Sequence, residues 1–181
     1  MPGKLFSAEE SAGHGHFMGM AIKLAEEALD RGEFPVGCVL VHEGRVVADG
    51  RRDGTSSCLA NEVDHAEMVA LRKVEPLLAR GHVTAPGIIC YSTLEPCLMC
   101  YASLLIHGIT RMVYAYEDAM GGGCACDLTV LPPLYSGISP VIAQGVMRRE
   151  SLALFQKFWS DEKNSYLKDS FLCRYTMNLP H

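Results

Sequence analysis

Two short motifs carry residue types that bind metal ions. Pro96-Cys97-Leu98-Met99-Cys100 places two thiols three residues apart directly behind a proline, and His65-Ala66-Glu67 places an imidazole and a carboxylate earlier in the chain. Taken alone, the cysteine motif fits a redox pair, half of a structural zinc clip or part of a catalytic metal site. Taken alone, the other motif is an ordinary helix start in which Glu67 completes a capping box. Together they favour a catalytic zinc site, because two cysteines cannot complete one without a further ligand.

The spacing within each motif indicates that both lie at helix starts. Residues i and i+2 point apart in the body of a helix, so His65 and the glutamate that follows it can share a site only in a first turn. We therefore expect Asp64 as the N-cap of one helix and Pro96 as the first residue of another. Cys97 then lies in a first turn, with Cys100 one turn further on the same face. The positive end of a helix also favours thiolates.

The predicted zinc ligands are His65, Cys97 and Cys100, with a fourth position open to water, as in catalytic sites. Glu67 is predicted to act as the proton shuttle, taking a proton from water and passing it to a ring nitrogen and then to the departing amine. This pattern, H-x-E followed by P-C-x-x-C, resembles that of zinc-dependent deaminases. We expect one zinc ion per chain. A zinc-stabilised binding protein without turnover is the alternative from another class, and the intact Glu67 argues against it.

The remaining cysteines carry weaker signals. Cys124-Ala125-Cys126 follows three glycines and fits either a second metal site or, more simply, a loop on the side of the active site. Cys38, Cys58, Cys90 and Cys173 are expected to be core or surface thiols, because cysteines in a reducing compartment rarely form disulfides.

Length and composition predict one soluble domain. The chain has 181 residues, of which 49% are hydrophobic and 20% are charged, and its net charge is −5. This balance argues against a globally basic nucleic-acid binder. No apolar run approaches the roughly 20 residues of a membrane span, and the polar N-terminus lacks the apolar stretch of a secretory signal. We therefore expect a cytoplasmic protein without a membrane partner.

Hydrophobic periodicity predicts alternating helices and strands. The order αββαβαβ followed by a variable tail describes an α/β sandwich around one sheet. The tail contains six aromatic residues, which are expected mainly to pack its helices. The expected helices cover residues 17–30, 65–78, 97–107 and most of 147–172; the expected strands cover 34–41, 45–48, 88–92, 111–116 and 141–143; and the expected loops cover 50–63 and 121–126.

The chain resembles the cytidine deaminase-like superfamily and, within it, the tRNA-adenosine deaminase family. The resemblance rests on residues 32–41, 65–67, 93–100, 104–107, 111–114 and 117–119. It implies a three-layer α/β/α sandwich with a mixed central sheet of about five strands, a bound zinc ion and a homodimer. The implied reaction is conversion of adenosine to inosine in tRNA. Residues 1–160 are expected to form the catalytic domain, and residues 161–181 a helical extension of it.

The resemblance also places the base pocket beside the first strand, around Phe34, Pro35 and Val36. Family members hold the nucleoside with an asparagine after the second strand, but the matching segment here is Asp-Gly-Arg-Arg-Asp at residues 49–53. Asn61 is the candidate to replace that asparagine. The departure keeps open a deaminase of a free base or nucleoside, such as guanine, cytosine or a related ring. A late aromatic residue reaching over the pocket, as in guanine deaminases of the superfamily, is the accompanying minority hypothesis.

Overall fold

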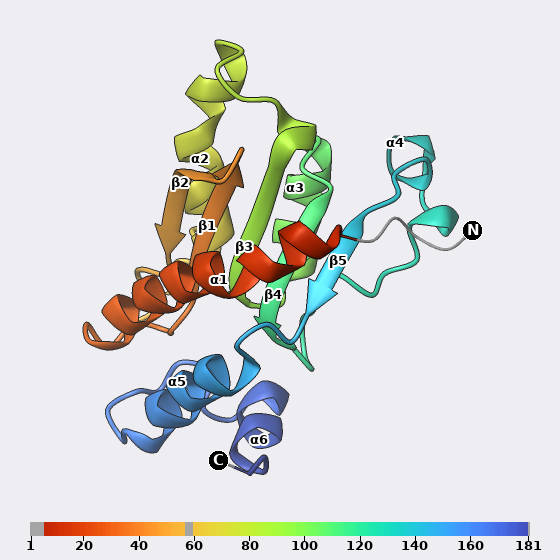
Figure 1. Ribbon diagram of the computed structural model, residues 1–181. Coiled ribbons are helices and arrows are strands. Elements are labelled where there is room, and N and C mark those ends of the chain that lie inside the picture. Colours follow the sequence, from red (N-terminus) through yellow and green to blue (C-terminus); the bar gives the residue numbers. More distant parts are fainter. Residues whose placement is uncertain (1–5, 57–59, 181) are drawn as a thin grey trace.

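The computed structural model describes residues 6–56 and 60–180, so Cys58 lies outside the described residues. Its centre is a five-stranded sheet in the order β2-β1-β3-β4-β5 (Figure 1). Strand β1 pairs antiparallel with β2 on one side and with β3 on the other. Strands β3, β4 and β5 run parallel to one another. The mixed sheet of five strands is confirmed. The strands are β1 (Gly37–His42), β2 (Arg45–Arg51), β3 (Ile88–Leu94), β4 (Arg111–Tyr116) and β5 (Val141–Gln144).

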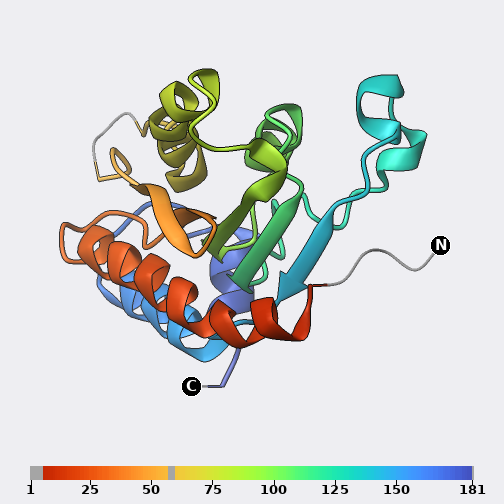
Figure 2. The ribbon, with the colours of Figure 1, turned by 45° about the horizontal axis from the view of Figure 1, so that its top comes forward.

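Helices cover both faces of this sheet, as Figure 2 shows. The helices α2 (Ala66–Ala79) and α3 (Leu98–Ile106) pack on one face, and α1 (Ala8–Leu29) packs on the other. Strand β3 is buried along its whole length, as expected for a strand covered on both faces. Its side chains alternate, so that Cys90 joins the core under α2 and α3 while Tyr91 joins the core under α1. The three-layer α/β/α fold is confirmed.

The remaining helices are α4 (Pro133–Ser136), α5 (Arg148–Ser160) and α6 (Phe171–Met177), with short 3-10 turns at Ala85–Gly87 and Leu128–Val130. Helices α5 and α6 lie beyond the end of the sheet at which β4 and β5 terminate (Figure 1). In parallel sheets this carboxyl end is where ligands bind. Among the described residues, no helix is both long and apolar enough to cross a membrane.

Several expected boundaries are wrong. Strand β1 begins at Gly37 rather than at residue 34, and β2 continues to Arg51 rather than ending at residue 48. Helix α1 begins at Ala8, well before residue 17, because Ser7 and Glu10 form a reciprocal capping box that nucleates it. His14 is consequently buried rather than part of a polar tail, and its Nδ1 lies 3.0 Å from the Tyr91 hydroxyl. The segment 147–172, expected to be mostly helical, is helical only at residues 148–160 and 171–172. It leaves helical geometry after Ser160 and returns only at α6, with turns between.

Candidate active site

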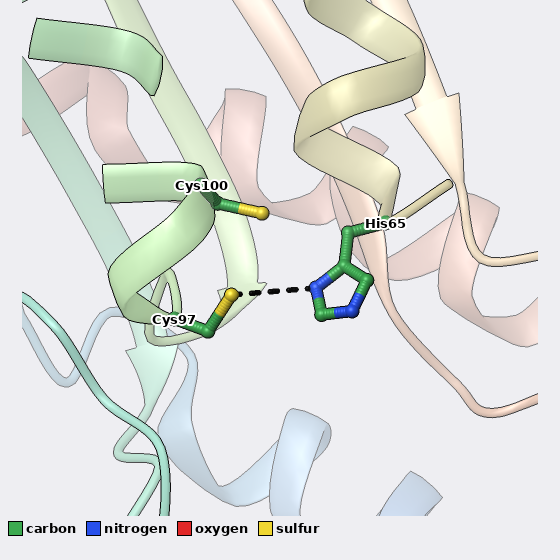
Figure 3. A group of neighbouring side chains, drawn as sticks. All are labelled: His65, Cys97 and Cys100. Carbon is green, nitrogen blue, oxygen red and sulfur yellow. Dashed lines mark hydrogen bonds between the residues drawn. The ribbon is translucent and has the colours of Figure 1, made fainter. Parts of the chain in front are cut away.

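The starts of α2 and α3 meet at the carboxyl end of β3 and bring three metal-binding side chains together. One ligand atom from each of His65, Cys97 and Cys100 lies within 4.8 Å of the other two. Figure 3 shows the three side chains pointing toward one another, with Cys97 Sγ 3.5 Å from His65 Nδ1. Among the residues that the structure describes, this is the only such cluster of histidine, cysteine and carboxylate side chains. Within residues 6–56 and 60–180, Cys124 and Cys126 belong to no second cluster.

Helix α2 begins one residue later than the sequence predicts, and α3 begins two residues after the expected first position, Pro96. His65 itself is the N-cap of α2, and Cys97 is the N-cap of α3; both have the extended backbone typical of that position. Asp64 instead accepts hydrogen bonds from Asn61 and Arg72. Pro96 precedes the cap and is outside the helix. The shift places the side chains of His65 and Cys97 at the N-terminal ends of their helices, so the three ligand side chains still converge.

The electrostatics of this cluster suit a cation. Hydrogen bonding from Cys100, reinforced by His65, lowers the pKa of the Cys97 thiol to about 4. The pKa of Cys100 is raised by the neighbouring Cys97 and by burial. In a pair of adjacent thiols, one pKa is lowered and the other is raised because the second thiolate would be repelled by the first. A metal ion removes that repulsion. One imidazole and two thiolates form a donor set that zinc prefers, so the residues fit the expected ion.

Glu67 lies beside the cluster and is almost fully buried, with 3% of its surface exposed. Burial is the main reason why the pKa of its carboxyl group is raised. The Ser92 hydroxyl, on β3, donates a hydrogen bond of 2.8 Å to Glu67 Oε1. The start of α2 has no side-chain capping hydrogen bond, so Glu67 does not complete a capping box. Its carboxyl group is therefore held against the sheet and not used to stabilise the helix.

A cavity of about 200 Å³ lies beside Glu67. The helix starts contribute His65, Glu67 and Cys97 to its wall, and the segment before β1 contributes Phe34 and Val36. Pro35 is not among the lining residues. The C-terminal segment of the same chain closes another side, where the lining side chains are Tyr166, Leu167 and Leu172. The Tyr166 ring also packs on Phe34, with ring centroids 5.3 Å apart.

Asn61 does not line this cavity. Its Nδ2 donates to Asp64, and its Oδ1 accepts from the backbone of Val63 and Asp64 at 3.0 Å each. These bonds close the turn that leads into α2. The cavity wall instead contains Arg52, whose guanidinium is bound by the backbone carbonyl of Asn61. Sequence reasoning located the departure at residues 49–53 but assigned Arg52 no role.

Glu95 was also missed, and it holds a loop over the site. This buried carboxylate accepts hydrogen bonds from the backbone of Asp118 at 3.3 Å and of Cys124 at 3.1 Å. In the same loop, Gly122 forms an isolated antiparallel bridge with Cys97 at the start of α3. The loop of residues 117–124 is thereby fastened beside the start of α3. Glu95 lies directly before Pro96 in the sequence motif, and this position was the signal that could have identified it.

Comparisons with known proteins agree with this site. The family model described as the cytidine and deoxycytidylate deaminase zinc-binding region matches residues 12–116. A tRNA-specific adenosine deaminase of Agrobacterium fabrum is 33% identical over 149 residues, which cover 82% of this chain and 95% of the relative. The tRNA-specific adenosine deaminase 2 of Xenopus tropicalis is 35% identical over 119 residues, covering 64% of this chain and 69% of the relative.

A solved structure from work on A-to-I editing by tRNA:A34 deaminases at the wobble position of transfer RNA shares the fold. Its TM-score is 0.63 at 33% sequence identity, and the match covers 77% of this chain and 98% of the other. The residues matched by the family model, 12–116, include both helix starts. The chain therefore belongs to the cytidine and deoxycytidylate deaminase family and is a zinc-dependent hydrolytic deaminase of nucleobases or nucleosides.

Proposed function

We propose that this deaminase converts adenosine to inosine in tRNA. The observation that carries the reaction is the convergence of the three-ligand cluster and the buried Glu67 on one cavity. The substrate follows from the relative in Agrobacterium fabrum, which this chain matches over 95% of its length. Conversion of adenosine to inosine is a hydrolysis, in which water replaces the amino group of the base and ammonia leaves.

We assign His65, Cys97 and Cys100 as the zinc ligands and Glu67 as the proton shuttle. When bound, zinc supplies the Lewis acidity that activates a water molecule near neutral pH. Glu67 takes a proton from that water and delivers it to a ring nitrogen of the base, and a second transfer protonates the amine that leaves. A raised pKa suits this role, because the carboxyl group must both accept and release a proton. The hydrogen bond from Ser92 orients its Oε1.

The charge of the cavity supports a neutral base as the group that enters. Four carboxyl groups line the cavity, those of Glu62, Glu67, Glu95 and Asp118, against the one guanidinium of Arg52. A phosphate inside this wall would be repelled. We therefore expect the base alone to enter, with the phosphates of an RNA substrate remaining outside.

A second candidate is a deaminase of a free base or nucleoside. It is favoured by the closure of the cavity by Tyr166, Leu167 and Leu172 of the same chain, and by the acidic net charge of −5. We further propose a homodimer located in the cytoplasm, on the basis of the family resemblance. The catalytic domain would comprise residues 1–160, and residues 161–181 would extend it; Leu172 of the extension joins the core that α2 and α3 share.

One experiment separates the two substrates. Purified protein is incubated with a tRNA transcript carrying adenosine at the wobble position and, in parallel, with guanine, cytosine, adenine and their nucleosides. Inosine is measured in the transcript and ammonia in the other reactions. We expect inosine at the wobble position and none in a transcript that carries guanosine there. Turnover of a free base or nucleoside with an unchanged transcript would overturn the tRNA proposal.

A further inference from the structure

We infer that Arg52 is a specificity-determining residue that donates hydrogen bonds to acceptor atoms on the bound base. The inference deepens the proposed function, because it requires that a base occupies the cavity beside Glu67. It rests on three observations: where Arg52 lies, how many of its donors are used, and how its charge is compensated.

Arg52 is placed in the cavity wall by the end of β2. Its backbone N–H donates to the Val36 carbonyl at 2.8 Å, which ties the residue to the segment before β1. Its side chain is only 2% exposed, yet it lines the same cavity as His65 and Glu67. Arginine is almost never fully buried unless it is paired. Glu62 supplies that partner, and the position of Arg52 in the wall of the active-site cavity makes it a candidate for contact with the substrate.

The part of the chain that the structure describes leaves some hydrogen-bond donors of the guanidinium without an acceptor. An arginine side chain has five N–H donors. Three hydrogen bonds are made by Arg52, one to the Asn61 carbonyl, one to Glu62 Oε2 at 3.2 Å and one to the Tyr166 hydroxyl at 3.2 Å. Two N–H groups thus have no acceptor among residues 6–56 and 60–180. An acceptor on a substrate in the cavity would give these N–H groups a partner and stabilise the complex.

The charge of Arg52 is already compensated, so the missing partner need not be an anion. Glu62 forms an ion pair with the guanidinium, and the Tyr166 ring lies beneath it, 5.7 Å from ring centroid to guanidinium carbon. A guanidinium can only donate hydrogen bonds. Arg52 therefore favours the edge of a neutral base that presents a ring nitrogen or a carbonyl oxygen. It disfavours a base that presents an N–H group at the same place, because two donors would then meet.

Tyr166 is a positioning residue for this contact. Its hydroxyl donates to Glu62 Oε2 at 2.8 Å and accepts from Arg52, so one group fixes both members of the ion pair. The Tyr166 backbone carbonyl accepts from the Trp159 indole at 3.0 Å, which anchors the segment to α5. Tyr166→Phe should therefore weaken the same substrate contact as a change of Arg52, raising KM more than it lowers kcat, and leave the zinc content unchanged.

The test pairs variants of Arg52 with substrates that lack single acceptor atoms. Wild type, Arg52→Met and, at the half-buried neighbour outside the cavity wall, Arg51→Met are assayed on an RNA stem-loop containing adenosine, 3-deazaadenosine or 7-deazaadenosine. We expect one analogue to lower kcat/KM about 10- to 100-fold for wild type and for Arg51→Met, the range for a hydrogen bond to a charged group. For Arg52→Met the same analogue should lower kcat/KM less than about threefold, because the partner is already absent.

The inference would be overturned if each analogue lowered kcat/KM by the same factor in Arg52→Met as in wild type. If Arg52→Met does not fold, Arg52→Lys replaces it in the same cycle, since lysine keeps the charge and loses the planar fork. Failure of the tRNA proposal is distinguishable, because wild type would then leave adenosine in RNA unchanged and release ammonia from another base. The cycle is in that case run with the deaza analogues of that base, and the same coupling is expected.

Discussion

Two buried glutamates lie within the active-site cavity, and their surroundings assign them different tasks. Burial raises the pKa of both Glu67 and Glu95. The oxygens of Glu95 accept hydrogen bonds from two backbone amides of the loop 117–124, so that its carboxyl group holds this loop in place. Glu67 accepts a hydrogen bond from the Ser92 hydroxyl and lies two residues from the metal-binding His65. Only Glu67 is placed to exchange protons with a water molecule at the cluster.

Replacement of Glu67 by glutamine should separate zinc binding from catalysis. The amide is close in size and can accept the hydrogen bond from Ser92, but it cannot take a proton from water. We expect Glu67→Gln to retain about one zinc ion per chain and to lose about 10²- to 10⁴-fold in kcat, the usual contribution of general acid–base catalysis. Metal analysis and a single-turnover deamination assay measure the two quantities.

The matched control for this variant is Glu75→Gln, which changes an exposed glutamate on the same helix. It should retain both zinc and activity. Full activity in Glu67→Gln would refute the shuttle role. Loss of zinc from Glu67→Gln would show that this residue supports the metal site and would leave its role in proton transfer without support.

Residue types and spacing were sufficient to predict the metal cluster and Glu67, because each motif is contiguous and its chemistry is specific. They were not sufficient for Arg52. Its role depends on Glu62 and on Tyr166, which is 114 residues away in the chain, so no local pattern contains the three. Asn61 was chosen on residue type alone, and the turn before α2 uses its side chain.

At the scale of elements, a glycine on β2 sets how closely α2 approaches the sheet. A Cβ atom at Gly50 would lie 2.0 Å from the Ala66 carbonyl oxygen and 2.9 Å from the Ala70 nitrogen. Both are backbone atoms of α2, so no side chain can move aside. The helix start that contributes His65 and Glu67 is thus held directly against the strand. Secondary-structure patterns predicted both elements, but this contact depends on their packing.

Gly50→Ala should therefore damage stability and the site together. Forcing α2 away from β2 is expected to destabilise the fold by about 1–3 kcal/mol, as overpacking does. It should also lower zinc affinity, because His65 would move relative to the two cysteines. Denaturant unfolding and zinc titration measure the two effects.

Gly15→Ala is the contrasting variant, since a Cβ at Gly15 meets no atom within 4 Å. It lies inside α1, where alanine stabilises a helix by roughly 0.5–1 kcal/mol relative to glycine. We expect it to raise stability and to leave zinc affinity unchanged. An unaltered midpoint of unfolding in Gly50→Ala would mean that α2 does not lie against β2 as described.

At the scale of the molecule, the active site is assembled at one end of the sheet from segments that are far apart in the chain. The segment before β1, the end of β2, the starts of α2 and α3 and the tail after α5 all contribute to the cavity wall. The two motifs predicted the helix starts, and the family resemblance placed the segment before β1 at the pocket, but the end of β2 was given no role in it. The sequence offered the tail only as the minority hypothesis of a late aromatic residue over the pocket, which the position of Tyr166 in the cavity wall matches. The turns after Ser160 have no period and are held by distant contacts such as that between Tyr166 and Phe34.

An ion pair fastens the C-terminal helices to the end of the sheet, and it should make stability depend on pH. Arg148 of α5 binds both oxygens of Glu117, which follows β4, and the Tyr175 hydroxyl of α6 donates to the same carboxylate at 2.9 Å. Burial alone would raise the pKa of Glu117. The hydrogen bonds from Arg148 and Tyr175 outweigh burial and lower this pKa below its ordinary value of 4.5.

A carboxyl group with a lowered pKa in the folded state stabilises the fold at pH values above about 4.5, and this contribution is lost as the pH falls through the folded-state pKa. Glu117→Gln should therefore lower the Tm at pH 7, and the difference from wild type should shrink as the pH falls from 4.5 toward 3. Thermal unfolding followed by circular dichroism at each pH measures it. In an Arg148→Met background, removal of the Glu117 charge should have a smaller effect at pH 7, because its main partner is gone. A Tm difference that stays constant across this range would show that the ion pair does not hold the tail in place.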